Sequence, residues 1–482
     1  MRKNPIQAQD EVFHKLLLKA EDTEWGKKYD YRSINDYETY RTRVPLQSYE
    51  DVEPYIQRLR NGEQNLLWPS EIRWYAKSSG TTNSKSKFIP VSYEALEYCH
   101  FLGGKDVYAI YLTNNPDNEI FKGKSLALGG SHQICEFNSE SYYGDLSAVM
   151  ISNLPFWADI KRIPSQNIAL LSEWEEKLSK MVEKTVNRKV TNIAGVPSWT
   201  LVLIKRILEY TGKKYLSEVW PDLELFIHGG ISFAPYRSQF DALIGNDKMN
   251  YMETYNASEG FFAIQDDPAR SDMLLMLDYG IFYEFITLND LSRGNNKTVS
   301  IQDVKTGVNY AMIISTNAGL WRYIIGDTIQ FTSKNPYKIK ITGRIKHFIN
   351  AFGEELIIDN ADKAIKKAAE KTNALIREYT VAPVYIDANN RGTHEWLIEF
   401  EQKPNNIDRF IEVLDNELKS LNSDYEAKRY KNITMDVPRV IFARENLFYD
   451  WLKKHNKIGG QHKIPRLKND RDLIEELIKM NN

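Results

Sequence analysis

The sequence contains few cysteines, and they are not spaced as a metal site would need. Among 482 residues there are two, Cys99 and Cys135. Two thiols cannot build a disulfide framework, and no C-x-x-C pair indicates zinc. We therefore expect a protein of the reducing cytoplasm.

The chain also lacks long apolar runs and an excess of charge of one sign. No run of about 18 apolar residues suggests a transmembrane helix, and the polar start of the chain does not resemble a signal peptide. The 63 basic and 65 acidic residues leave a formal charge of −2, whereas nucleic-acid-binding surfaces are usually rich in lysine and arginine. We expect neither membrane nor nucleic-acid partners.

What the chain does contain is the composition of a folded protein with several domains. Hydrophobic residues make up 42% and charged residues 27%, close to globular averages. At roughly 150 residues per domain the length predicts two to four domains. The aromatic residues, 12% of the chain, can supply large cores and an aromatic-lined pocket.

Hydrophobic periodicity divides the first 345 residues into helical and mixed regions. Residues 7–60 repeat apolar side chains at helical spacing and predict amphipathic helices. Further on, short apolar runs alternate with helical patterns, of which 172–186 and 198–210 are the clearest. Candidate strands lie at 125–128, 192–196, 223–226, 251–255, 281–285, 310–315 and 329–331. This alternation predicts an α/β architecture with both parallel and hairpin-linked strands.

The character of the sequence changes near residue 346. Roughly 135 residues from there to the end have the pattern of a small α+β domain. We expect a large domain over 1–345 and a small one over 346–482. The predicted elements of the small domain are helices over 359–371, 407–421 and 473–480, and a hairpin turn at 389–392.

A loop rich in small and hydroxylated residues forms the first candidate site. Successive N–H groups and hydroxyls can surround phosphate oxygens, and Lys85 or Lys87 can add positive charge. A surface loop of no special function has the same composition, and the G-x-x-x-x-G-K-[ST] pattern of a Walker loop is absent. The loop contains Ser78, Ser79, Gly80, Thr81 and Thr82.

The second candidate site follows the predicted strand at 251–255. Tyr255 can lie over a purine, and Glu259 can approach Mg²⁺, which prefers oxygen ligands and shares them with phosphates. Residues 258–260, Ser-Glu-Gly, are equally compatible with an ordinary loop.

The third candidate site is the Gly326-Asp327 pair at the end of an apolar run. A carboxylate there can accept hydrogen bonds from both hydroxyls of a ribose. A Gly-Asp turn between two strands is the structural alternative. The basic residues Arg344 and Lys346 follow, and taken alone they suggest a solvated edge.

Together these segments resemble the adenylate-forming enzymes, the superfamily of acyl-CoA synthetases, peptide-synthetase adenylation domains and luciferases. Within it they are most similar to the plant auxin-responsive acyl acid amido synthetases and their bacterial relatives. The resemblance spans nearly the whole chain and implies an α/β fold with a large N-terminal domain of mixed sheets and helices and a smaller, mobile α+β C-terminal domain. The matching segments are 78–82 with Lys87 and Pro90, 255–259, and 323–327.

Two positions depart from the family pattern. Ser84 stands where many relatives have a second glycine, so the backbone of the first loop has less freedom to approach phosphate. In the third motif Arg322 precedes the tyrosine, and Ile324 occupies the usual place of the arginine. The geometry of the phosphate loop and any role of an arginine therefore depend on the structure.

The resemblance implies an ATP-dependent ligase that forms a carbon–nitrogen bond. A carboxylate attacks the α-phosphate of ATP, which gives an acyl-adenylate and pyrophosphate, and an amine, usually of an amino acid, then takes the acyl group and releases AMP. By resemblance, Lys87 and the 78–82 loop bind phosphate, Tyr255 and Ser258 belong to the adenine segment, Asp327 binds ribose, and Glu259 is catalytic and binds Mg²⁺.

Further site residues are implied at three places. Gly229 and Gly230 resemble the segment that lies along adenine, although a Gly-Gly pair is also a common strand exit. Arg344 would contact the nucleotide and Lys346 would lie at the hinge between domains. Lys463 resembles the mobile lysine of the superfamily, and a solvated basic loop is its alternative.

The acid and the acceptor are open at this stage. The ranges 93–112 and 154–171 are plausible walls of an acid pocket, although their aromatic residues suit an ordinary core equally well. Alternatives to the amido synthetase are an acyl-CoA ligase that uses the same adenylate and a relative that binds nucleotide without turnover. The histidines His132, His228 and His394 lack metal-cluster spacing, and we expect them to be structural or exposed.

Overall fold

The computed structural model describes most of the chain. Within the described part, the structure has no helix of the length and apolar character needed to cross a membrane. The described residues are 1–78, 87–129, 135–138, 141–171, 173–230, 233, 236–345, 348–349, 351, 354, 356–385, 392–422, 425–426, 429, 435–455, 457 and 463–481.

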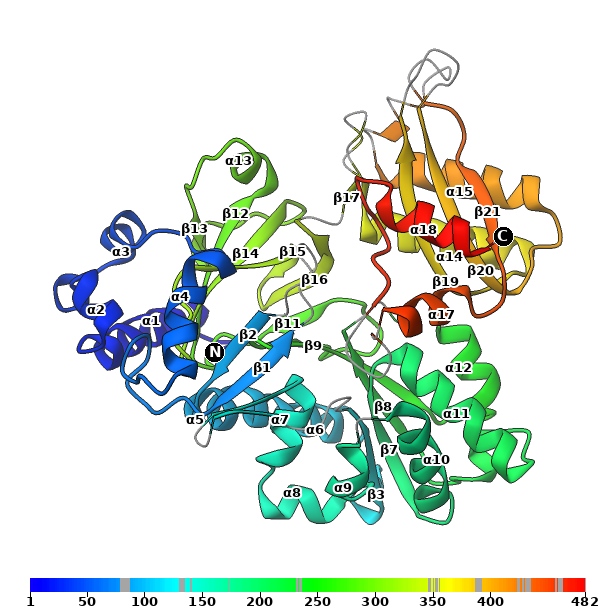
Figure 1. Ribbon diagram of the computed structural model, residues 1–482, viewed down its shortest axis with the longest axis horizontal. Coiled ribbons are helices and arrows are strands. Elements are labelled where there is room, and N and C mark those ends of the chain that lie inside the picture. The colour runs from blue at the N-terminus through cyan, green and yellow to red at the C-terminus, as the bar shows by residue number, and fades with distance from the viewer. Residues whose placement is uncertain are drawn as a thin grey trace.

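The chain begins with helices that cover one side of the large domain (Figure 1). Their buried faces repeat every three or four residues, as in α1, where Val12 and Leu16 pack into the core. Ser48 and Asp51 form a reciprocal capping box at the start of α4. The prediction of helices within 7–60 is confirmed. They are α1 (Pro5–Ala20), α2 (Glu24–Lys28), α3 (Tyr37–Arg43) and α4 (Tyr49–Arg60).

A twelve-stranded sheet forms the centre of the large domain. One half is parallel and contains, in order, β6 (Arg162–Ile163), β3 (Lys124–Leu128), β7 (Val190–Gly195), β8 (Leu225–Gly229) and β9 (Asn250–Ala257). The other half is antiparallel and continues with β10 (Gly260–Ile264), β11 (Met273–Leu275), β16 (Tyr337–Arg344), β15 (Tyr323–Lys334), β14 (Asn309–Thr316), β12 (Ile281–Thr287) and β13 (Val299–Ser300).

Alternate residues of each strand point to opposite sides of the sheet. In the parallel half, both sides pack against a hydrophobic core. Leu225 packs with the core that contains α6, whereas Phe226 packs with the core around α10, α11 and α12. These helices are α6 (Phe101–Asn114), α10 (Trp174–Thr185), α11 (Pro197–Thr211) and α12 (Arg237–Ile244).

Smaller elements complete the large domain. A four-stranded sheet has the order β2 (Lys87–Val91), β1 (Trp74–Ser78), β5 (Ser141–Gly144), β4 (Cys135–Asn138). Short helices are α5 (Tyr93–Ala95), α7 (Leu146–Ser152), α8 (Phe156–Lys161), α9 (Gln166–Ala169) and α13 (Leu288–Ser292).

Most strand and helix predictions for the first 345 residues are confirmed, with two corrections. The strand predicted at 223–226 begins at Leu225, because pairing with β9 starts there and Leu223 instead donates its backbone N–H to Trp220. The strand predicted at 329–331 is the middle of β15, which begins at Tyr323. Gly326 and Asp327 therefore lie inside a strand, and the alternative of a Gly-Asp turn is wrong.

The C-terminal part has its own three-stranded sheet and its own cores. The predicted helices and hairpin are confirmed, whereas residues 389–391 of the hairpin turn lie outside the described residues. The strand β21 and helix α17 were not predicted. The elements are β17 (Phe348–Ile349), β18 (Leu356–Ile357), α14 (Ile358–Thr372), β19 (Leu375–Val384), β20 (Thr393–Gln402), α15 (Ile407–Leu421), β21 (Arg439–Ala443), α17 (Leu447–Lys454) and α18 (Asp472–Asn481).

Polar contacts fasten this C-terminal part to the helices of the large domain. Gln239 of α12 donates to the Ile376 carbonyl at 3.1 Å. Lys205 of α11 pairs with Glu401 at 2.8 Å. Figure 1 shows α17 beside α11 and α12, so the two parts meet along the same side of the sheet.

Candidate active site

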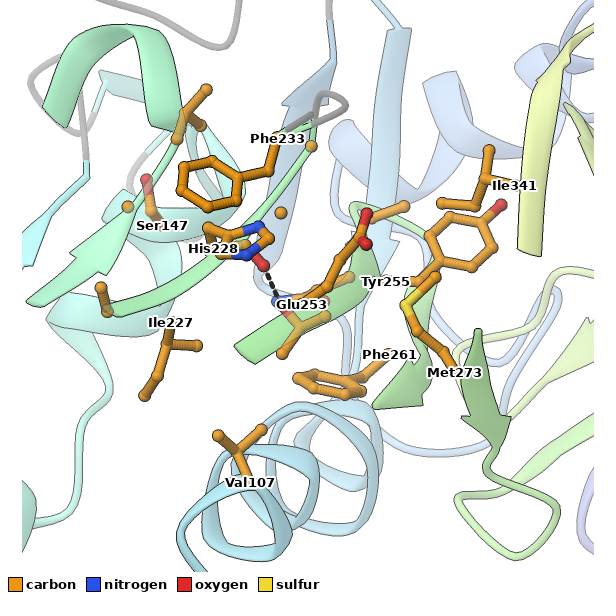
Figure 2. Close-up of a pocket in the computed structure, with 18 of the residues that line it drawn as sticks. Val107, Ser147, Ile227, His228, Phe233, Glu253, Tyr255, Phe261, Met273 and Ile341 are labelled. Atoms are coloured by element: carbon orange, nitrogen blue, oxygen red, sulfur yellow. Dashed lines mark hydrogen bonds between the residues drawn. The ribbon is translucent and has the colours of Figure 1, made fainter. Parts of the chain in front are cut away.

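One cleft of about 1930 Å³ runs along the carboxyl edge of the parallel strands. Residues that follow β7, β8 and β9 line one side, and β15, β16 and residues 463–466 line the other. Figure 2 shows side chains from several strands and from α6 gathered around this space. Ligands of open α/β sheets bind at such strand ends.

A glycine pair stands at the exit of β8. Close backbone approach requires glycine at the first position, and backbone conformation favours it at the second. A side chain at Gly229 would place its Cβ 2.4 Å from the Thr254 carbonyl oxygen of β9. Gly230 has φ of +82°, which favours glycine. Both residues border the cleft, so the pair is a tight strand exit and also part of the site wall.

The second motif spans the turn from β9 to β10. Tyr255 is 5% exposed, and its ring packs on Phe262 with 4.8 Å between centroids. Its hydroxyl donates to Asp327 at 2.7 Å. Ser258 is also buried, and it borders the cleft. The predicted stacking of Tyr255 on adenine stays a prediction.

The third motif brings Asp327 against Arg344. The two residues face each other in the β15–β16 ladder, and the Arg344 Nε atom lies 2.9 Å from Asp327 Oδ1. Because Tyr255 contacts the other oxygen, each carboxylate oxygen of Asp327 has one partner among the described residues. The nearby Asp327 charge raises the pKa of Arg344, which keeps this guanidinium charged.

Glu259 is half-buried at the same cleft. Burial, together with the neighbouring Asp327 charge, raises the pKa of Glu259 to about 7. Near neutral pH the carboxyl of Glu259 is therefore present in both its protonated and its ionised form. A cation at this point would favour the ionised form.

Lys463 reaches the cleft from the C-terminal part of the chain. Its ammonium donates to the Gly230 carbonyl at the exit of β8. Partial loss of hydration, and then the positive charge of Arg344, lower the pKa of Lys463 to about 8. The predicted mobile lysine thus stands beside Gly230 and Arg344, although 119 positions separate it from Arg344 in the sequence.

Part of the predicted site lies outside the described residues. Lys87 borders the cleft, with its Nζ 5.4 Å from the centre of the Tyr49 ring. Ser78 ends β1 and faces Lys87 in the β1–β2 pair. The predicted residues outside the described part are Ser79, Gly80, Thr81, Thr82 and Lys346, together with His132.

Sequence reasoning did not single out Glu253, two residues before Tyr255 on β9. It borders the cleft between His228 and Tyr255 (Figure 2). Burial alone raises the pKa of Glu253 to about 7. Strand alternation was an available signal, because residues two apart on a strand share a face.

His228 and His394 have the structural character that was predicted, whereas His132 lies outside the described residues. Burial, helped by the Arg237 charge, lowers the pKa of His228 to about 3, so its ring is neutral in the cleft wall. His394 is fully buried, with its Nε2 atom 2.8 Å from Glu354. Within the described residues, no group of three or more His, Cys, Asp or Glu side chains could hold a metal.

Parts of the two ranges predicted as walls of an acid pocket border the cleft, and their contact with an acid stays a prediction. Phe101 and Tyr108 of α6 and Leu154 border the cleft. Phe156, by contrast, is 81% exposed, and Tyr111 is buried in the core. Residues on α6 therefore form the wall more than residues on α8 do.

The fold of this chain matches the folds of a solved CoA ligase and a solved amido synthetase. The structure matches a 2-hydroxyisobutyryl-CoA ligase in its postadenylation state, with a TM-score of 0.63, 12% identity, and coverage of 98% of this chain and 91% of that one. It matches the GH3.15 acyl acid amido synthetase with a TM-score of 0.79, 18% identity, and coverage of 99% and 93%.

The chain belongs to the GH3 family. The family's N-terminal domain matches residues 1–249, its central domain 274–344, and its C-terminal domain 359–472. The indole-3-acetic acid-amido synthetase GH3.3 of Arabidopsis thaliana is 21% identical, with 99% of this chain and 92% of the relative covered. The resemblance stated from the motifs is confirmed.

Proposed function

We propose that the protein is an ATP-dependent acyl acid–amido synthetase. A carboxylate oxygen attacks the α-phosphorus and pyrophosphate leaves; the amine nitrogen then attacks the acyl carbon, AMP leaves, and the nitrogen loses a proton. The convergence of Tyr255, Asp327, Arg344 and Lys463 on one cleft carries this proposal. Membership of a family whose relatives are named amido synthetases supports it.

Asp327 is suited to hold the ribose of ATP. Tyr255 and Arg344 each use one lone pair of its carboxylate and fix its orientation. A carboxylate has about four lone-pair sites, so two stay available for a pair of hydroxyls. Gly229 and Gly230 border the same cleft, and we assign them to the segment that lies along the adenine.

Lys463 is suited to neutralise charge on the α-phosphate. With a pKa of about 8, Lys463 is protonated in most molecules at pH 7. An ammonium in a site from which substrate displaces water stabilises developing negative charge more strongly than it would in water. Arg344, on the same side of the cleft, adds a second positive charge.

The site also suits Mg²⁺ shared with ATP. Mg²⁺ is usually bound by one or two carboxylates and by substrate phosphates, and Glu259 supplies one such carboxylate. When bound, the ion would neutralise phosphate charge. Glu259 must give up its proton to act as a ligand. We assign phosphate contacts to Lys87 and to residues 78–82.

We further propose that the domains are 1–345 and 346–482 and that Lys346 lies at their hinge. Separate cores on the two sides support this division. Rotation of the small domain would remove Lys463 from the cleft and admit the amine. The cytoplasm stays the proposed compartment, since two cysteines provide no disulfide framework.

Pyrophosphate exchange with a panel of carboxylic acids tests this function. Acid-dependent incorporation of labelled pyrophosphate into ATP is expected, because adenylation is reversible. Mass spectrometry of reactions with amino acids or CoA then identifies the acceptor. An amide supports the proposal, a thioester replaces it with an acyl-CoA ligase, and no exchange with any acid indicates a nucleotide-binding relative without turnover.

A further inference from the structure

A group of three polar side chains lies deep in the cleft, away from the nucleotide residues. It consists of Tyr108 on α6, Ser125 on β3 and Asn192 on β7, and all three border the cleft. Ser125 and Asn192 face each other in the β3–β7 ladder. We call this group the distal polar cluster.

The distal polar cluster is well separated from the carboxyl edge of the sheet. Asn192 lies three residues before Gly195, the last residue of β7. At about 3.3 Å per residue in a strand, this distance is about 10 Å. A molecule that reaches the cluster from the nucleotide end must therefore be elongated.

The orientation of the Asn192 amide follows from its neighbour. The Thr191 hydroxyl donates its hydrogen to the Ile120 carbonyl at 2.5 Å, so its oxygen can only accept from Asn192. The Asn192 amide nitrogen lies 3.3 Å from that oxygen. This contact turns the amide oxygen of Asn192 toward the cluster.

Both hydroxyl hydrogens of the cluster are used inside it. Ser125 donates to the Asn192 amide oxygen at 2.6 Å, and Tyr108 donates to the same oxygen at 3.0 Å. The two hydroxyl oxygens lie 3.3 Å apart. What the hydroxyls still offer to the cleft is lone pairs, so the cluster is suited to a ligand that donates a hydrogen bond.

The space between the cluster and the carboxyl edge is lined by small and apolar residues. Ala127 and Ala194 are neighbours on β3 and β7, and Gly104 has no atom within 4 Å of where a Cβ would stand. Val107, Ile227 and Phe261 add apolar walls (Figure 2). An aromatic ring or an aliphatic chain suits this space.

We propose that the distal polar cluster recognises a hydroxyl or N–H group at the far end of an elongated, apolar acyl acid. The inference rests on the proposed function, because it assumes that the carboxylate lies at the nucleotide end. None of the three side chains carries a charge, so the cluster favours a neutral donor. Buried polar groups of this kind set specificity more strongly than apolar contacts do.

Matched acids with the full-length protein test the proposal by pyrophosphate exchange. The probes are phenylalkanoic acids of increasing chain length, each with a 4-hydroxyl, a 4-methoxyl or no substituent. We expect kcat/KM to be about tenfold higher for the hydroxyl acid of best length than for its methoxyl and unsubstituted partners. Exchange with all three at equal kcat/KM would overturn the inference but leave the proposed function intact, whereas no exchange with any acid would remove both.

Two tyrosines on the same helix provide the matched variants. Tyr108→Phe is expected to abolish the preference for the hydroxyl acid, measured as the ratio of kcat/KM for the hydroxyl acid to kcat/KM for the unsubstituted acid. Tyr111→Phe is the control, since its hydroxyl contacts Asn250 at 3.2 Å in the core, and it should keep the preference. Ser125→Ala should reduce the preference as Tyr108→Phe does. A preference that survives both cluster variants would overturn the proposal.

Discussion

Two arginine–carboxylate pairs contain residues in or near the third motif and have different surroundings. Arg322, just before β15, pairs with Glu284 of β12 at 2.8 Å. Arg344 of β16 pairs with Asp327 of β15 at 2.9 Å. Arg322 directly precedes the third motif, and Arg344 follows it further along the chain. The surroundings of the two arginines differ in the structure.

The Arg322 pair is closed to ligands. The side chains of Arg322 and Glu284 are 2% and 0% exposed. The guanidinium also donates to the Arg41 and Val44 carbonyls at 2.6 Å and to the Thr298 hydroxyl at 2.8 Å. With its donors engaged by protein, this arginine connects the N-terminal helices to the sheet.

The Arg344 pair is open to the cleft. Its arginine side chain is 44% exposed and that of Asp327 is 11% exposed. Its contact with the carboxylate runs through Nε, and Arg344 borders the cleft, so we propose that its terminal nitrogens contact phosphate. The comparison teaches that two arginine–carboxylate pairs of similar length differ in solvent access: one is enclosed by protein, and the other faces the cleft.

Removing the arginine of the closed pair should have the largest effect, and the effect is on stability. Arg322→Met leaves Glu284 buried without a counter-charge, and the free energy of unfolding should fall by about 3–5 kcal/mol. Denaturant unfolding followed by fluorescence measures this change. Arg344→Met is the matched variant and should lose less than about 1 kcal/mol, since its arginine is half exposed. Equal losses would contradict the distinction between the two pairs.

The next effect concerns Lys463, the cation beside the open pair. Lys463→Ala should slow acid-dependent pyrophosphate exchange by about 100- to 1000-fold, as loss of one charge-stabilising donor does in other enzymes. ATP affinity measured by calorimetry should change less than about threefold. Lys468→Ala is a control on the same segment, where Lys468 pairs with Asp470. Small and equal effects on rate and affinity would show that Lys463 has no special role.

Asp327→Ala tests the open pair directly. ATP affinity should fall by about 10- to 100-fold, because two hydrogen bonds to a charged acceptor are lost. Calorimetric titration with ATP measures the loss. Tyr255→Phe keeps the aromatic ring but removes the donor to Asp327, and its effect should be smaller than that of Asp327→Ala. An unchanged ATP affinity in Asp327→Ala would exclude this carboxylate from the nucleotide site.

The smallest effect is a pH dependence. In the proposed role Glu259 must be ionised to hold a cation, so kcat/KM for exchange should rise as pH passes about 7. Lys463 acts when protonated, so the same quantity should fall as pH passes about 8. Lys463→Arg should shift the falling limb to higher pH, because arginine keeps its proton. A falling limb at an unchanged pH in Lys463→Arg would assign it to another group.

The sequence predicted local structure well where one face of an element is apolar. The helix predicted over 407–421 has the same bounds as α15, because its apolar spacing is regular and Asn406 caps its start. β16 was not predicted. Its residues include Thr342, Gly343 and Arg344, which suggest a loop, and pairing with β15 places this end of β16 in a strand.

The order of the three motifs along the sequence determined the family. Regular apolar spacing determined the α/β class and the general positions of most helices and strands, because this spacing is a property of residues that are close in the chain. The tertiary structure decided which polar residues meet. Tyr255 and Asp327 are 72 positions apart, and strand register brings the hydroxyl of one to the carboxylate of the other. Register also placed Ser125 beside Asn192. It left the Arg344 side chain at the cleft, whereas Arg322 is buried, because such contacts depend on how distant strands align.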